Sequence, residues 1–416
     1  MKLVELAKLV REEAMELQEE MEKHQMRLHK HPEVGFELKE TCEYVYQQLE
    51  EMGYLPKRVG KAGITALLEG SCPGPTFLLR ADMDALPIAE ENDDKEKSEN
   101  GYMHACGHDF HTAMLLGAAR ILQNHREELC GNVKMMFQPA EELLEGAKDM
   151  IRDGVLEDPQ VDGALMIHVL TGLPLATGTC IVSAPGVSAP AADYFTIEVQ
   201  GKGCHGSSPN TGIDPLTAAA HILIALQEIK AREMGATEAA VLTIGSFHGG
   251  EVANVIPDKV ILEGTLRAFG EELRSYLHKR IIDITGDIAK AFRAKAEVKF
   301  GSGCPTLVNE KELSEAVKKS LEELLGHDKC FGSDSFARQS NGGNGRNTGM
   351  SGSEDFAYVS HRVPSVMVAL VAGSSSQGYV YPLHHPKVRF DRQALPVGAA
   401  VYAYSAISRL GSFEKQ

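Results

Sequence analysis

Residues 76–84, with the sequence TFLLRADMD, combine the pattern of a buried strand with two acidic side chains. A run of residues typical of a buried strand, 76–80, is followed almost at once by Asp82 and Asp84. Polar side chains directly after a strand are typical of the edge of an open α/β sheet, where ligand sites form. The stretch therefore predicts an α/β fold with a functional site at the end of this strand.

Other segments show the same arrangement, in which a strand is followed by side chains that can bind a metal or transfer a proton. Glu141 and Glu142 follow one expected strand, and His168 lies at the tip of another. These residues should meet at the same edge of the sheet as the two aspartates. The expected elements are strands at 64–69, 133–138 and 164–169 and a helix at 111–123.

Between residues 188 and 303 the pattern changes to strand, helix, two strands, helix, strand. This βαββαβ order is typical of a self-contained unit. We therefore expect an inserted domain at 188–303 within a catalytic metal-binding domain formed by 1–187 and 304–416. Its expected elements are strands at 193–201, 240–247, 259–269 and 296–301 and helices at 215–232 and 271–295.

The composition limits the classes of partner. The 416 residues exceed one ordinary core, which favours two domains. With 42 basic and 58 acidic residues the net charge is −16, which argues against nucleic acid or an anionic membrane.

Residues 1–25 lack the apolar core of a signal peptide, and no apolar run is long enough to span a bilayer. The eight cysteines form no C-x-x-C pair, so we expect reduced thiols and a cytoplasmic protein.

Residues 103–111, MHACGHDFH, concentrate metal-ligand types before an expected helix. Cys106 and His108 stand two apart around a glycine and can point at one centre. His111 fits better as a supporting neighbour of a metal histidine than as a ligand. A buried structural thiol is the competing interpretation of Cys106.

Glu141 and Glu142 are adjacent, so they cannot share one face of a helix and can take two different roles. One carboxylate can bind a metal while the other takes a proton from activated water. Stabilisation of a helix start after Pro139 is the plainer alternative. His384 and His385 stand between prolines, and residue chemistry alone leaves open which of them is a ligand.

Motifs along residues 28–391 resemble the M20 metallopeptidase family, in particular its amidohydrolase branch of aminoacylases, hippurate hydrolases and indole-acetyl-amino-acid hydrolases. Their number and order make the resemblance specific. They are LHKHPEVG (28–35), RADMDALP (80–87), CGHDFH (106–111), QPAEE (138–142), GKGCH (201–205), NVIPD (254–258), GTLR (264–267) and SEDF (353–356).

The resemblance implies a dinuclear metal centre in which Cys106 bridges two divalent ions and Glu141 acts as general base and then acid. It favours His384 over His385 and gives Asp84 the role of orienting a ligand through a hydrogen bond. A thiolate bridge suits zinc, whereas relatives of this branch often use manganese; cobalt and nickel are further options. The implied ligands are Cys106, His108, Glu142, His168 and His384.

The resemblance also implies a mixed central sheet flanked by helices and a ferredoxin-like inserted domain that serves as a lid and in dimerisation. His205 would polarise the scissile carbonyl, and Asn254 and Arg267 would hold the substrate carboxylate or the oxyanion. His205 and Asn254 would serve the active site of the second subunit of a homodimer. Cys204 departs from the small residue usual at its position.

We therefore expect a hydrolase that cleaves the amide bond of a small anionic N-acyl amino acid. A dipeptidase or carboxypeptidase is the nearest alternative. A hydrolase with Cys106 as nucleophile is an alternative from another class, and a non-catalytic metal-binding or peptide-binding protein is a third.

Overall fold

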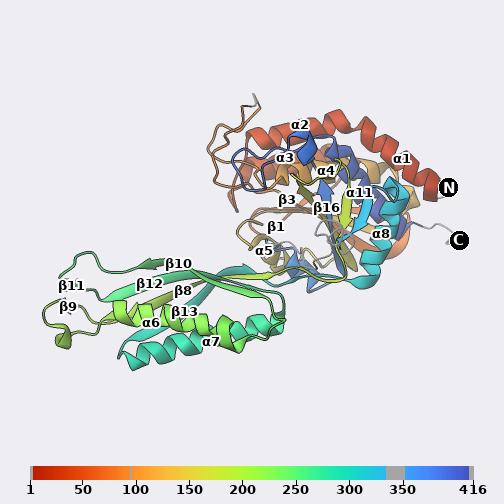
Figure 1. Ribbon diagram of the computed structural model, residues 1–416. Coiled ribbons are helices and arrows are strands. Elements are labelled where there is room, and N and C mark those ends of the chain that lie inside the picture. Colours follow the sequence, from red (N-terminus) through yellow and green to blue (C-terminus); the bar gives the residue numbers. More distant parts are fainter. Residues whose placement is uncertain (1–2, 94–95, 334–351, 412–416) are drawn as a thin grey trace. The chain divides into compact units, whose positions relative to one another are not determined.

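The computed structural model describes residues 3–93, 96–333 and 352–411 (Figure 1). Contacts along the chain divide it into two compact units. The larger unit comprises Met1–Ser188, Val308–Thr348 and Asp355–Gln416, and the inserted unit comprises Ala189–Leu307 and Gly349–Glu354.

An eight-stranded mixed sheet forms the centre of the larger unit, in the order β1-β2-β4-β3-β5-β16-β6-β15. The neighbours β4, β3, β5 and β16 run parallel, whereas β1, β2 and β6 pair antiparallel with β2, β4 and β16. The strands are β1 (Lys57–Val59), β2 (Gly63–Glu69), β3 (Cys72–Asp82), β4 (Cys130–Gln138), β5 (Gly163–Leu170), β6 (Cys180–Val182), β15 (Cys330–Gly332) and β16 (Ser365–Val371).

The central strands are mostly apolar because both faces of the sheet are covered. All seven residues of β16 are buried, as are the last seven of β3. Such continuous apolar runs are typical of parallel strands between helices. The main core joins these strands to the helices α1 (Leu3–Glu16), α2 (Gln18–Lys30), α3 (Lys39–Glu51), α4 (His108–Asn124), α8 (Lys311–Leu325) and α11 (Ala394–Leu410).

The two most deeply buried helices, α4 and α11, pack against each other and against β3. Two shorter helices, α5 (Gly146–Arg152) and α10 (Ala357–Ser360), contact each other near β4 and β16. No helix within the described ranges is both long and apolar enough to cross a bilayer.

The inserted unit contains a four-stranded antiparallel sheet in the order β10-β12-β8-β13. Buried and exposed residues alternate along β12, as expected when only one face of a sheet is covered. The apolar face packs on two helices, which Figure 1 shows together along one side of the sheet. In chain order the elements are β8 (Ala191–Gln200), α6 (Pro215–Glu228), β10 (Ala240–His248), β12 (Lys259–Ala268), α7 (Glu271–Ala291) and β13 (Lys295–Cys304).

Several short elements have no counterpart in the expectations from sequence. The amphipathic N-terminal segment is two helices, interrupted at Leu17. The helix expected at 111–123 begins at His108, so the last residue of the Cys-Gly-His motif lies in its first turn. Short strands also form two small paired sheets: β7 (Gly186–Ala189) with β14 (Leu307–Asn309), and β9 (Cys204–His205) with β11 (Val255–Ile256).

The expectation of eight reduced cysteines is wrong for one pair. Cys72 and Cys130 form a disulfide with a Cα–Cα distance of 4.6 Å. The two residues stand directly opposite each other at the start of the parallel strands β3 and β4. A sequence pattern that considers only near neighbours along the chain does not detect a pair separated by 58 positions. The other six cysteines are free thiols.

Candidate metal centre

In the larger unit, the ligand candidates lie together at the carboxyl ends of the central strands. Asp82 is the last residue of β3 and Asp84 follows two positions later, and His168 lies near the end of β5. Parallel strands place such positions at one edge of the sheet. The remaining candidates are Cys106 and His108 at the start of α4, Glu141 and Glu142 after β4, and His384 in the loop that precedes α11.

Cys106 belongs to two groups of side chains that can each hold an ion. Its thiol sulfur lies 3.5 Å from Nε2 of His168 and 3.3 Å from Nε2 of His384. The first group is Cys106, His108 and His168, and the second is Cys106, Glu142 and His384; within each group the ligand atoms lie within 4.8 Å of one another. The sulfur is the one atom common to both groups.

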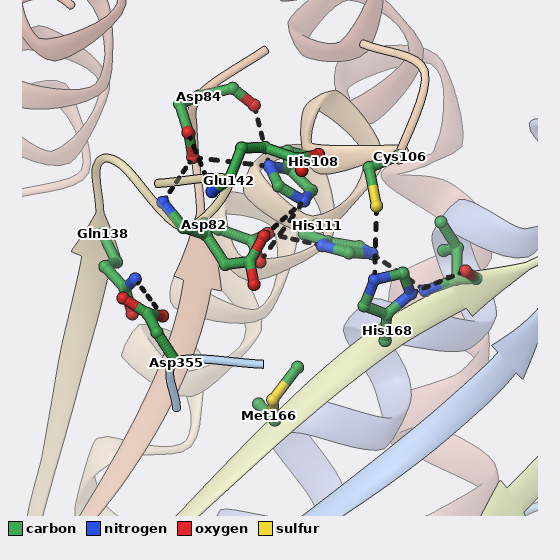
Figure 2. A network of polar contacts seen from close by, with 12 residues as sticks. Asp82, Asp84, Cys106, His108, His111, Gln138, Glu142, Met166, His168 and Asp355 are labelled. Carbon is green, nitrogen blue, oxygen red and sulfur yellow. Dashed lines mark hydrogen bonds and ion pairs between the residues drawn. The ribbon is translucent and has the colours of Figure 1, made fainter. Parts of the chain in front are cut away.

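Asp84 holds three members of the centre in place (Figure 2). Its carboxylate accepts hydrogen bonds from the backbone N–H of Glu141 at 2.9 Å and of Glu142 at 3.2 Å. Its backbone carbonyl lies 2.7 Å from Nδ1 of His108. Asp84 alone therefore fixes the two adjacent carboxylates, Glu141 and Glu142, and the imidazole of His108.

The imidazoles are oriented as metal ligands commonly are. Nδ1 of His108 faces the carbonyl of Asp84, and Nδ1 of His168 faces the carbonyl of Val169 at 2.8 Å. When Nδ1 donates its proton in this way, Nε2 keeps a lone pair for a cation.

The buried polar atoms of the centre fit a cation. Nε2 of His108 and Oε1 of Glu142 are buried and make no hydrogen bond to any described residue. Burying such atoms without a hydrogen bond is costly, and a bound divalent ion would remove that cost. Thiolate, imidazole and carboxylate ligands together suit zinc and related borderline ions.

The backbone is unusual at three points around the centre. Gly107 has φ +88°, and a Cβ there would stand 2.4 Å from Cγ2 of Val169, so only glycine fits between the two ligands of this motif. Ala140, directly before Glu141, and His384 have φ of 52° and 64°. Left-handed conformations cost non-glycine residues about 1 kcal/mol or more and concentrate at functional sites.

Burial and neighbouring charges shift the titration of the centre. Burial, followed by the charge of Glu142, raises the pKa of the Cys106 thiol well above its usual range. Burial raises the pKa of Glu142 to about 7. A cysteine nucleophile needs a lowered pKa, so the environment disfavours Cys106 as a nucleophile. A metal ligand instead acquires its negative charge from the cation.

A network of buried charges beneath the centre is absent from the sequence predictions. Arg80 is fully buried and donates to Asp82 at 2.6 Å, to Asp355 at 3.1 Å and to Gln138 at 2.8 Å. Asp355 also accepts from Gln138 and from the backbone N–H of Ala147. An arginine within the apolar run 76–84 was the available signal, because a buried arginine requires acidic partners.

The two candidates left open by residue chemistry, His384 and His385, have different surroundings. His384 faces Cys106 and lies 3.4 Å from Oε1 of Glu142. The ring of His385 stacks on Tyr381 with centroids 4.5 Å apart. Within the described residues, His384 is thus the one of the pair that lies beside the other ligand candidates.

The three candidates in the inserted unit do not gather at one place within it. His205 and Asn254 are exposed neighbours: Val255 pairs with His205, and the carbonyl of Asn254 accepts from Gly206. Arg267 lies near the far end of β12 and donates to the hydroxyl of Ser353. From Lys259 to Arg267, eight residues of strand at about 3.3 Å each span about 26 Å.

A cavity of about 450 Å³ in the larger unit is separate from the ligand candidates. Its walls include His29, Glu90, His104, Phe390 and Arg392, and its lining contains none of the residues grouped around Cys106. The cavity therefore adds no residue to the candidate metal centre.

The chain belongs to the peptidase family M20/M25/M40, whose family model matches residues 78–408. It is 35% identical to N-acetyl-L-cysteine deacetylase of Bacillus subtilis (strain 168), across 92% of this chain and 86% of that protein. It is also 35% identical to IAA-amino acid hydrolase ILR1-like 2 of Arabidopsis thaliana, across 98% and 88%. A solved structure of Bacillus subtilis YXEP protein, described as a dinuclear metal binding peptidase from the M20 family, is 30% identical with a TM-score of 0.76, covering 95% of this chain and 99% of that one.

Proposed function

We propose that this protein is a dinuclear metal-dependent amidohydrolase that cleaves N-acyl amino acids into a carboxylic acid and an amino acid. The membership of Cys106 in two ligand groups carries the proposal, because one sulfur between two sets of donors suits a pair of ions. Relatives named as an N-acetyl-L-cysteine deacetylase and an IAA-amino acid hydrolase support the substrate class.

Cys106, His108 and His168 would hold one ion, and Cys106, Glu142 and His384 would hold the other. Divalent ions bound here would supply Lewis acidity, which polarises a carbonyl and makes water more acidic. Zinc or manganese is the proposed metal, with cobalt or nickel as alternatives. Through its three contacts, Asp84 keeps the ligands His108 and Glu142 and the neighbouring Glu141 in place.

Glu141 is the proposed general base and acid. Its carboxylate lies 3.9 Å from Nε2 of His108, and its backbone is held by Asp84. Glu141 takes a proton from water as the water attacks the amide carbonyl. It then delivers this proton to the leaving nitrogen, so that the amide C–N bond breaks and a neutral amine departs.

The inserted unit is the proposed ferredoxin-like lid and dimerisation domain. Its β10-β12-β8-β13 order and its two helices support this assignment, and β10 forms an edge of the sheet. His205 would polarise the scissile carbonyl and Asn254 would assist it, while Arg267 would bind the substrate carboxylate. Because His205 and Arg267 lie at opposite ends of one unit, we propose a homodimer in which His205 and Asn254 serve the partner's site.

The replacement Glu141→Ala tests the proposal. General acid–base catalysis contributes roughly 10²- to 10⁴-fold, so kcat on N-acetyl and N-benzoyl amino acids should fall by about that factor. Bound metal, measured by elemental analysis, should remain at the wild-type level. Glu145→Ala is the matched control, since Glu145 pairs with Lys148 on the same segment and should be dispensable. A Glu141→Ala variant with near wild-type kcat would remove Glu141 from this role.

Substrate and inhibitor panels separate the alternatives. A dipeptidase or carboxypeptidase would prefer substrates with a free α-amino group over their N-acyl counterparts. A cysteine-nucleophile hydrolase would keep its activity after exhaustive chelation and lose it on alkylation. Binding of N-acyl amino acids without any product would indicate a non-catalytic protein.

A further inference from the structure

His111 has a fixed protonation pattern that its neighbours determine. Its ring is fully buried, with Nδ1 2.5 Å from Oδ1 of Asp82 (Figure 2). Its Nε2 accepts the backbone N–H of Val169 at 2.8 Å. A backbone N–H can only donate, so Nε2 carries a lone pair and Nδ1 carries the proton. His111 is therefore a neutral imidazole without a lone pair to spare for a metal.

Val169 needs this acceptor because β5 no longer pairs with β3 at this point. The pairing of β3 with β5 ends at Arg80 and Met166. On its other side β5 continues to pair with β16 as far as Leu170. His111 thus takes the place of a strand neighbour at the end of β5, beside the metal centre.

The same residue, Val169, orients a metal-ligand candidate. Its carbonyl accepts the Nδ1 proton of His168, which leaves Nε2 of His168 3.5 Å from the sulfur of Cys106. The rings of His111 and His168 also meet edge to face, with centroids 4.8 Å apart. His111 therefore contacts His168 directly and also through the backbone that sets the His168 tautomer.

Asp82, the acceptor for Nδ1 of His111, is held by a buried ion pair. Asp82 is fully buried and accepts from Arg80 at 2.6 Å on the carboxylate oxygen that His111 does not use. Thr112 donates to the backbone carbonyl of Asp82. The acceptor for His111 is therefore fixed from two sides.

We propose that His111 is a positioning residue that acts through Val169 on His168. It sets the affinity of the ion held by Cys106, His108 and His168 and leaves the ion held by Cys106, Glu142 and His384 largely unchanged. The inference rests on the proposed metal centre.

Two substitutions, whose side chains differ by one methylene, test the two hydrogen bonds of His111 separately. His111→Gln keeps a donor for Asp82 and an acceptor that reaches the N–H of Val169. His111→Asn keeps the donor for Asp82, but its amide is too short to reach Val169. Cobalt(II) titration of the metal-free protein, followed by calorimetry, should show one of two binding steps weakened about 10- to 100-fold in the Asn variant. In the Gln variant both steps should stay within about threefold of wild type.

A double-mutant cycle tests whether the effect passes through His168. His168→Ala should weaken the same binding step, and adding His111→Asn to it should produce little further loss. A purely structural role would make the two losses additive and would contradict the proposal. His125→Asn is the matched control: His125 is a buried histidine that caps the other end of α4 and contacts Glu13 and Glu128. It should lower the melting temperature while both binding steps persist.

A measurement on the wild-type protein keeps the proposal testable if a variant does not fold. Long-range ¹⁵N spectra of histidine-labelled protein should show His111 as the neutral Nδ1–H tautomer, and an Nε2–H form would overturn the proposal. Loss of both ions in His111→Asn, or loss of neither, would also overturn it. A wild-type protein that binds fewer than two cobalt ions would overturn the proposed function itself, and the inference with it.

Discussion

The two units present their functional candidates in opposite ways. In the larger unit the candidates converge at one edge of the sheet and hold each other: Asp84 binds Glu141, Glu142 and His108 at once. In the inserted unit His205 and Asn254 are exposed, and Arg267 is a strand length away from them. The larger unit thus preorganises the proposed metal centre by itself, whereas the proposed substrate-binding residues of the inserted unit do not form one site within it.

Among changes in the inserted unit, His205→Ala should have the largest effect, which is a loss of turnover. Removing a group that stabilises an oxyanion typically lowers kcat about 10²- to 10³-fold, and bound metal should stay at the wild-type level. Mixing this variant with Glu141→Ala tests which chain's site His205 serves. If His205 serves a partner's site, mixed dimers should recover part of the activity that neither variant has alone. Absence of recovery after verified subunit exchange would assign His205 to its own chain.

A smaller effect is expected from Arg267→Lys. Lysine keeps the charge but loses the planar two-donor geometry that matches a carboxylate. Loss of one charge-assisted hydrogen bond of about 1.5 kcal/mol corresponds to a rise of about tenfold in KM for an N-acyl amino acid. The matched amide substrate, which lacks the free carboxylate, should show no such difference between variant and wild type. Equal effects on both substrates would remove Arg267 from carboxylate binding.

In the larger unit an effect on stability, and not on turnover, is expected from a partly buried histidine. Burial lowers the pKa of His29, but hydrogen bonds and charges from Asp109 and Glu90 outweigh it and raise this pKa to about 10. In the unfolded chain the pKa is near 6.5. The stabilisation is therefore complete below about pH 6.5 and is lost as the pH rises through about 10.

The melting temperature of His29→Gln relative to wild type tests this network. The deficit of the variant should be largest near pH 6 and should shrink toward pH 10. A deficit that stays constant over this range would show that the charge of His29 does not contribute.

The sequence predicted those helices and strands whose hydrophobic pattern is visible among residues close together in the chain. The apolar runs of β3, β4 and β5 are continuous, so their existence could be read from neighbouring residues. The three-residue strands β6 and β15 carry too little pattern to be recognised. They form because partner strands offer a free edge, which is a property of the assembled sheet.

Long-range partners were the second class of feature that sequence reasoning missed. Cys72 and Cys130 become neighbours only through the register of β3 and β4. Arg80 finds Asp355 across 275 positions. His384 faces the sulfur of Cys106 from a left-handed backbone conformation, whereas His385 stacks on Tyr381. Such choices depend on backbone geometry that residue types alone do not specify.

The metal stoichiometry of Cys106→Ala directly tests whether one sulfur is shared by two ions. The variant loses the sulfur common to both ligand groups, so each group would keep two of its three side chains. Elemental analysis should find two ions per chain in the wild-type protein and a loss of both in Cys106→Ala, together with loss of hydrolysis. A Cys106→Ala protein that still retains two tightly bound ions would contradict the shared-sulfur centre.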